Sequence, residues 1–204
     1  MMDARTMKPA GPTLSGLLVL VVGPSGAGKD TLIMMARDIL ADDRNIRFPR
    51  RVVTRDQSPS EDNEAITPEA FDDAVASDAF ALWWRAHGHG YGIRRSIDED
   101  LRQGRTIVMN VSRAVVAGVR EVYPNTAVVL ITAPDHVLAE RLALRQRSSD
   151  HALDHRLRRA SLVVDAPDAV IDNIGSPKNH GQDFAAMIRA RFGRPETPRA
   201  GNGG

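Results

Sequence analysis

The sequence predicts an α/β fold in which helices flank a parallel sheet, and three observations indicate it. The segment Leu17–Val22 (LLVLVV) is a continuous apolar run that ends at a glycine, as strands buried on both faces do. The pattern G-x-x-x-x-G-K, with Gly23, Gly28 and Lys29, follows it directly. Similar apolar runs then alternate with amphipathic segments. Together these features predict the P-loop NTPase fold.

Three further buried strands are predicted, at residues 106–111, 126–132 and 168–173. An amphipathic segment follows each of the four strands and predicts a helix; in chain order these segments are DTLIMMARDIL, SRAVVAGVREVY, PDHVLAERLALRQR and QDFAAMIRARF. Ligands of such sheets bind at the carboxyl ends of the strands. We therefore expect the chemistry to lie just after Val22, Val111 and Thr132.

Residues 52–95 interrupt the alternation and predict a small inserted lobe. The segment holds aromatic and polar residues, a short helical stretch, TPEAFDDAVAS, and a glycine-rich turn, HGHGYG. Residues 1–15 and 194–204 are rich in Pro, Gly, Ala and polar residues and predict flexible tails. One domain of residues 16–193 is expected, because 204 residues suffice for a single sizeable core.

The composition argues against several classes of function. A formal net charge of +1 gives no general attraction to nucleic acid or to a membrane surface. The chain has no cysteine, which excludes disulfides, thiolate metal sites and a cysteine nucleophile. The longest apolar run is far too short to span a bilayer and no export signal is evident, so a cytoplasmic protein is expected. The oligomeric state stays open, with a homodimer as one alternative.

The loop that follows the first strand is the main candidate site. Its glycines let successive backbone N–H groups converge on one centre, and the helix N-terminus adds positive potential, which predicts binding of the ATP phosphates. Lys29 is predicted to reach the terminal phosphates and to be catalytic. A glycine turn that holds a lysine by chance is disfavoured by the strand before the loop and the helix after it. The predicted cofactor-binding residues of the loop are Gly23, Pro24, Ser25, Gly26, Ala27, Gly28, Lys29, Asp30 and Thr31.

Asp30 departs from the usual pattern, in which a serine or threonine hydroxyl binds Mg²⁺. A carboxylate repels a triphosphate unless a metal lies between them. Three interpretations stay open: a Mg²⁺ ligand, either direct or through water; an acid stabilised by the helix dipole; or a lesion that disables the site. Thr31 points about 100° further round the helix and is a poor substitute.

Beyond this loop, the chain resembles the guanylate kinase-like family. The resemblance covers about residues 17–192 and is carried by the segments GPSGAGKD, RRVVTRD, WWRAHGHGYG, MNVSRA and ERLALRQR, with a later HRLRRA. It implies an ATP- and Mg²⁺-dependent kinase with an acceptor-binding lobe and a helical lid at about residues 145–157. Within the family the chain is most similar to kinases of bacterial phosphonate breakdown. Their implied acceptor is a small phosphorylated sugar, a ribose bisphosphate whose 1-phosphate receives the γ-phosphate of ATP.

Departures from guanylate kinase argue against guanylate as the acceptor. Ser58 stands where the family has a second phosphate-binding arginine, and Leu82 stands where an acid reads the base. A leucine would leave the donors of guanine unpaired at a cost of about 1–3 kcal/mol each. The sequence therefore favours an acceptor without a purine.

Several basic and aromatic residues of the lobe remain to hold an acceptor phosphate. Arg55, Tyr91 and Arg94 are the predicted substrate-binding residues. Arg50 and Arg51 either extend this cluster or are solvated charges at a strand edge. Because alternate side chains of a strand face opposite ways, not all of these residues can reach one ligand.

Arginines near the predicted lid are candidates for stabilising the transition state. The resemblance implies that Arg145 and Arg156 close over the phosphates and are catalytic. Arg147 lies between them. The alternative is a set of surface arginines paired with Asp150 or Asp154, which would stabilise the helix by only about a few tenths of a kcal/mol. Arginines on both sides of a polar linker favour the lid.

Residues at the strand ends complete the predicted site. Asn173 matches a position near the adenine in related kinases, or is an ordinary strand-end asparagine. Guanylate kinases carry acids after the central strand, where this chain has Asn110 and Ser112, both predicted to contact the substrate. One carboxylate is absent there while another is present at Asp30. We hypothesise that Asp30 supplies part of the charge that holds Mg²⁺.

No triad of nucleophile, base and orienting residue is evident, which fits a phosphate acceptor whose oxygens are already nucleophilic. His87 and His89 are expected to be turn residues or substrate contacts rather than bases. Two rival functions stay open beside a sugar-phosphate kinase. One is a kinase of a nucleoside monophosphate, and the other is a catalytically silent binding module that keeps the fold.

Overall fold

The computed structural model describes residues 4–6, 14–56, 62–144 and 166–192. Across these ranges no helix is both long enough and apolar enough to cross a membrane. The elements are β1 (Ala4–Thr6), β2 (Leu17–Val22), α1 (Lys29–Ile39), β3 (Ile46–Arg47), β4 (Arg51–Val53), β5 (Asn63–Ala65), α2 (Pro68–Ala76), β6 (Phe80–Ala86), β7 (His89–Arg94), α3 (Ile97–Arg102), β8 (Thr106–Asn110), η1 (Arg113–Val115), α4 (Val116–Val122), β9 (Thr126–Thr132), α5 (Asp135–Leu144), β10 (Ala169–Asp172), α7 (Pro177–Met187) and η3 (Ile188–Phe192).

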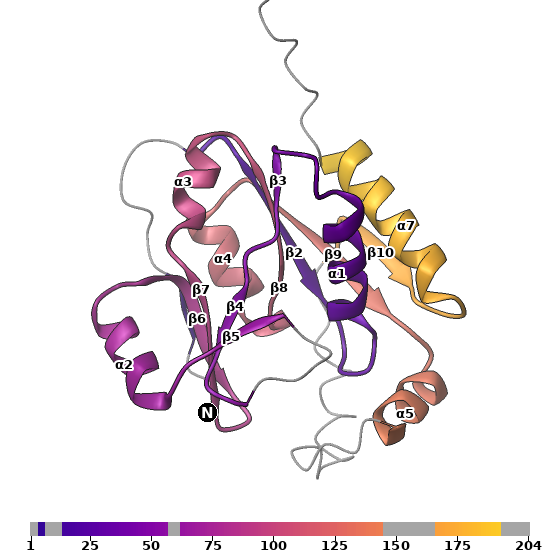
Figure 1. Cartoon of the computed structure of the whole chain (residues 1–204), viewed down its shortest axis with the longest axis horizontal. Helices are drawn as coiled ribbons and strands as arrows, with labels where there is room; N and C mark the ends of the chain where they lie inside the picture. Colours follow the sequence, from indigo (N-terminus) through magenta and orange to yellow (C-terminus); the bar gives the residue numbers. More distant parts are fainter. Residues whose placement is uncertain (1–3, 7–13, 57–61, 145–165, 193–204) are drawn as a thin grey trace, which may run out of the picture.

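The first sheet confirms the predicted α/β fold. Its strand order is β10-β9-β2-β8-β3, and every neighbouring pair runs parallel (Figure 1). The four predicted strands correspond to β2, β8, β9 and β10 within one residue at each end. The short strand β3 is an addition, and it pairs with β8 through only two residues.

Helices cover both faces of this sheet, which explains why β2 is apolar throughout. Leu18, Leu20 and Val22 join one core cluster, to which α3 and α4 contribute. Val19 and Val21 join the other, built with α1 and α7, and Figure 1 shows these two helices side by side. Alternate residues of a strand face opposite sides, so a strand between two helical layers has no face left for polar residues.

The second sheet has the order β1-β6-β7-β4-β5, and α2 packs on one face of it. Its aromatic core explains the glycines of HGHGYG. A Cβ on Gly90 would lie 2.8 Å from the Phe71 ring, and one on Gly92 would lie 2.6 Å from the Phe80 ring. Both glycines belong to β7, and only His87 and Gly88 form the turn. The predicted glycine-rich turn is therefore wrong for residues 89–92, because these glycines make room for rings.

The N-terminal segment differs in part from the predicted flexible tail of residues 1–15. Ala4–Thr6 forms β1 and pairs antiparallel with β6, with Ala4 opposite Trp84 and Thr6 opposite Leu82. An edge strand offers unpaired backbone N–H and C=O groups, and pairing with them needs no apolar side chains. Residues 194–204, the other predicted tail, lie outside the described residues.

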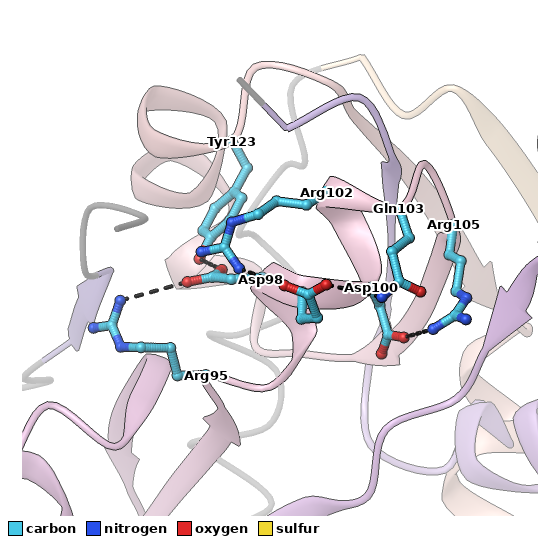
Figure 2. Close-up of polar contacts among 8 residues, drawn as sticks. Arg95, Asp98, Asp100, Arg102, Gln103, Arg105 and Tyr123 are labelled. Atoms are coloured by element: carbon cyan, nitrogen blue, oxygen red, sulfur yellow. Dashed lines mark hydrogen bonds and ion pairs between the residues drawn. The ribbon is translucent and has the colours of Figure 1, made fainter. Parts of the chain in front are cut away.

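A polar cluster joins α3 to Tyr123, the residue that follows α4. Asp98 is only 2% exposed, and it accepts a hydrogen bond of 2.8 Å from the Tyr123 hydroxyl. Arg95 Nη1 lies 3.5 Å from the same carboxylate, and Arg105 pairs with Asp100 nearby (Figure 2). Burial, together with the Asp98 charge, raises the pKa of Tyr123 above its ordinary value of about 10.

We expect Tyr123→Phe to lower the free energy of unfolding by about 1–3 kcal/mol, because a buried carboxylate loses a donor. The raised pKa also predicts a pH effect. Above about pH 10 the unfolded chain releases the tyrosine proton while the folded chain keeps it, so stability falls by up to about 1.4 kcal/mol per pH unit. Urea unfolding between pH 8 and 11 measures both effects, and the variant should lose less stability in alkali than the wild type. Equal alkaline slopes would contradict the assignment.

Candidate active site

The phosphate loop connects β2 to α1 and depends on its glycines. Gly23, Gly26 and Gly28 all have positive φ, and Gly28 is the left-handed residue just before α1. A Cβ on Gly23 would lie 1.9 Å from the carbonyl oxygen of Ile131, at the end of β9. The loop therefore curls against the neighbouring strand and directs the N-terminus of α1 towards the carboxyl edge of the sheet.

Lys29 reaches back across this loop. Its Nζ donates hydrogen bonds of 2.9 Å to the carbonyl of Gly23 and 3.0 Å to that of Pro24. The ammonium group thus lies against the first residues of the loop. Converging N–H donors with one ammonium are the donor set that suits a triphosphate, so the loop fits ATP. Ser25 is exposed in the loop and Thr31 is half-buried in the first turn of α1; their contacts with ATP stay predictions.

Asn173 holds the loop from below. Asn173 is 3% exposed, and its Nδ2 donates a 2.8 Å hydrogen bond to the carbonyl of Ala27. A Cβ on Gly28 would lie 2.4 Å from the same Nδ2. The amide of Asn173 therefore braces the loop, which places it beside the nucleotide site, and its predicted contact with adenine stays untested.

Arg141, on α5, was not predicted as a site residue from the sequence. Its Nη2 donates a 2.9 Å hydrogen bond to the carbonyl of Asn173. Its Nη1 and the Oδ1 of Asn173 are buried without hydrogen-bond partners among the described residues. Buried polar atoms are normally satisfied, so these two groups mark a place where a ligand can complete the hydrogen bonding. Its position in the sequence could have indicated it. In the predicted helix that follows β9, Arg141 lies four residues before Arg145, and residues four apart are neighbours on a helix surface.

Asp30 contacts Asn110, the residue that stands where guanylate kinases carry an acid. Asn110, at the end of β8, donates a 2.7 Å hydrogen bond from Nδ2 to Asp30 Oδ1. Arg51 Nη2 lies 3.8 Å from the same oxygen. The described residues hold no cluster of three or more His, Asp or Glu side chains suited to a metal ion. Mg²⁺ commonly takes one or two carboxylates together with substrate phosphates, so Asp30 fits the role of a single protein ligand.

A groove lies between α1 and the second sheet. Asp30, Met34 and Arg37 of α1 line one side, and the end of β8 adds Asn110. The other side is lined by residues of the segment 48–51, by residues 62–63 and by Ile93. Arg37 and Arg50 both pair with Asp62 across the rim.

Tyr91 lies on the same face of the second sheet as Ile93, the face towards the groove. Its ring stacks on Trp84, with centroids 5.4 Å apart and an interplanar angle of 9°. The guanidinium of Arg51 lies over the Tyr91 ring at 5.4 Å. Arg55 lies half-buried two residues beyond β4.

Arg94 is not brought together with Tyr91, although both were predicted to bind the acceptor. It pairs with Glu64 at 2.5 Å and lies over Phe80, on the face that α2 covers. Positions 91 and 94 differ by an odd number, so their side chains leave the strand on opposite faces. The structure therefore places Arg94 apart from Tyr91, and its predicted contact with the acceptor stays a prediction.

Ser112 also has a local structural role. Its side chain accepts a 3.4 Å hydrogen bond from the Ala114 N–H and caps η1. The predicted lid of residues 145–157, with Arg145, Arg147 and Arg156, lies outside the described residues. Its catalytic role stays a prediction.

A parallel sheet with a G-x-x-x-x-G-K loop at its carboxyl edge, facing a second sheet across a groove, defines a P-loop kinase. Comparison with known proteins makes this specific. The guanylate kinase family model matches residues 15–177. A protein of Rhodopseudomonas palustris, named ribose 1,5-bisphosphate phosphokinase PhnN, is 53% identical over 94% of this chain and 95% of its own length. The protein of that name from Bradyrhizobium diazoefficiens is 49% identical over 88% and 91%.

The chain therefore belongs to the guanylate kinase family and, within it, to the group of the PhnN phosphokinases. A solved guanylate kinase from Anaplasma phagocytophilum shares the fold, with a TM-score of 0.67 and 17% identity over 88% of each chain.

Proposed function

We propose that this chain transfers the γ-phosphate of ATP to the 1-phosphate of ribose 1,5-bisphosphate, giving 5-phosphoribosyl 1-diphosphate and ADP in phosphonate breakdown. The observation that carries the proposal is the identity of 53% over nearly the whole chain with a kinase of that name. The position of Leu82 agrees with it. Leu82, at the position of the base-reading acid, is fully buried in the core, so it offers a purine no polar partner.

The reaction needs positioning and charge neutralisation more than acid–base chemistry. An oxygen of the acceptor 1-phosphate forms a bond to the γ-phosphorus of ATP. The bond from that phosphorus to the bridging oxygen breaks, and ADP leaves with the oxygen and its electron pair. Lys29 and the N–H groups of the loop stabilise the negative charge on the transferred group. Mg²⁺, when bound with ATP, supplies further neutralisation, and Asp30 would hold it.

We expect ADP release in the presence of ribose 1,5-bisphosphate to exceed release with GMP by at least about 10³-fold in kcat/KM, because a site without the base's polar partners rejects it. A coupled ADP assay with both acceptors, and with AMP, CMP and UMP beside them, measures this ratio. Preference for a nucleotide would replace the proposal by a nucleoside monophosphate kinase. ATP turnover with any acceptor excludes a silent binding module.

A further inference from the structure

Arg51 occupies the place where the loop and the second sheet meet. It opens β4, and its side chain is 13% exposed, while that of Asp30 is 27% exposed. Both residues line the groove. Asn63, opposite Arg51 on β5 and itself 7% exposed, lines the same groove. An arginine with its head group in a groove, rather than in bulk solvent, is typical of a site for an anion.

The Arg51 guanidinium is held in position from behind. It lies over the Tyr91 ring, which is stacked in turn on the buried Trp84. A cation over an aromatic face is attracted by the ring electrons, which helps to fix its position. Because the guanidinium is planar and carries its donors in a fixed fork, such support orients it for two hydrogen bonds to one phosphate.

The contact with Asp30 is electrostatic. Arg51 Nη2 lies 3.8 Å from Asp30 Oδ1. This separation exceeds the length of a charged hydrogen bond, which is about 2.7–2.9 Å. A small shift of the guanidinium towards an incoming anion therefore breaks no short bond to this carboxylate. Its positive charge also offsets the repulsion between Asp30 and that anion.

The position identifies which phosphate would bind. Asp30 follows Lys29 directly, and Lys29 lies where the terminal phosphates of ATP are expected. A phosphate on Arg51 would thus lie beside the γ-phosphate. If the proposed function holds, we infer that Arg51 binds the reacting 1-phosphate of the acceptor and is a specificity-determining residue of this kinase.

Calorimetric titration in the presence of MgADP, which prevents turnover, tests this inference. We expect Arg51→Gln to weaken ribose 1,5-bisphosphate and ribose 1-phosphate by a similar factor, about 10- to 100-fold, the loss expected for hydrogen bonds to a charged group. Ribose 5-phosphate, which lacks the reacting phosphate, should bind both forms equally. Arg51→Lys should fall between them, because it keeps the charge and loses the fork.

Arg85→Gln is the matched control. Arg85 belongs to the same sheet and lies over an aromatic ring, Phe71, at 5.3 Å, but on the face away from the groove. It should change acceptor affinity by less than about twofold, because its side chain leaves the sheet on the other face. The Kd of ADP and the melting temperature should stay near the wild-type values in all three variants.

Three outcomes would overturn the inference: unchanged affinity for ribose 1-phosphate in Arg51→Gln, a selective loss for ribose 5-phosphate, or an equal loss for ADP. Failure of the wild type to bind or phosphorylate ribose 1,5-bisphosphate would instead overturn the proposed function, and this inference with it. The wild-type measurement thus separates the two failures.

Discussion

Replacing Lys29 by alanine is expected to lower kcat/KM for phosphoryl transfer by about 10²–10³-fold, the loss typical of a donor aimed at developing charge. The ammonium spans the mouth of the loop through its hydrogen bonds to Gly23 and Pro24. Alanine cannot reach the terminal phosphates, whereas the N–H groups of the loop remain. We therefore expect kcat to fall more than the affinity for ATP, because the charge on the transferred group is largest in the transition state.

Lys178→Ala is the control for this experiment. It removes the same type of side chain from the exposed start of α7, where, among the described residues, no hydrogen bond or ion pair of Lys178 to the loop is seen. Its kinetics should match those of the wild type. If Lys29→Ala also kept kcat within a factor of about two, far from the loss typical of a donor of this kind, the loop would not be the catalytic site.

The nucleotide half of the fold could be predicted from the sequence because its signals are local. A buried strand, a glycine pattern and a helix follow one another within Leu17–Ile39, and each has a pattern of its own. β3 could not be predicted in this way. Ile46 and Arg47 pair with β8 through the backbone, and two residues are too few to show any period.

The acceptor half depends on contacts through space. HGHGYG predicts a turn because glycine is the common turn residue, yet Gly90 and Gly92 are required by Phe71 and Phe80, which come from other elements. The alternation rule was sufficient to separate Tyr91 from Arg94, but which face looks towards the loop depends on how the two sheets pack.

Asp30→Ser is expected to raise the Mg²⁺ concentration needed for half-maximal activity about 10-fold or more, because a neutral hydroxyl attracts the cation less than a carboxylate does. The serine hydroxyl can still bind the metal, but the site then lacks the carboxylate. Asp30→Ala removes both, so its requirement should be higher still. Activity at limiting Mg²⁺ that is unchanged in both variants would exclude Asp30 from the metal site and leave it the roles of binding Asn110 and facing Arg51.

The contact of 2.7 Å between Asn110 and Asp30 permits a stricter experiment, in which the carboxylate is moved instead of removed. The double variant Asp30→Ser with Asn110→Asp restores one negative charge at the end of β8, within hydrogen-bond distance of its original place. If the charge near the phosphates is what holds Mg²⁺, the double variant should need less Mg²⁺ than Asp30→Ser alone. A double variant no better than Asp30→Ser would show that the carboxylate acts only from the loop, where it also lies beside Arg51. The KM for the acceptor distinguishes a role of Asp30 in holding Mg²⁺ from a role in the acceptor site beside Arg51. If Asp30 only holds the metal, that KM stays unchanged at saturating Mg²⁺.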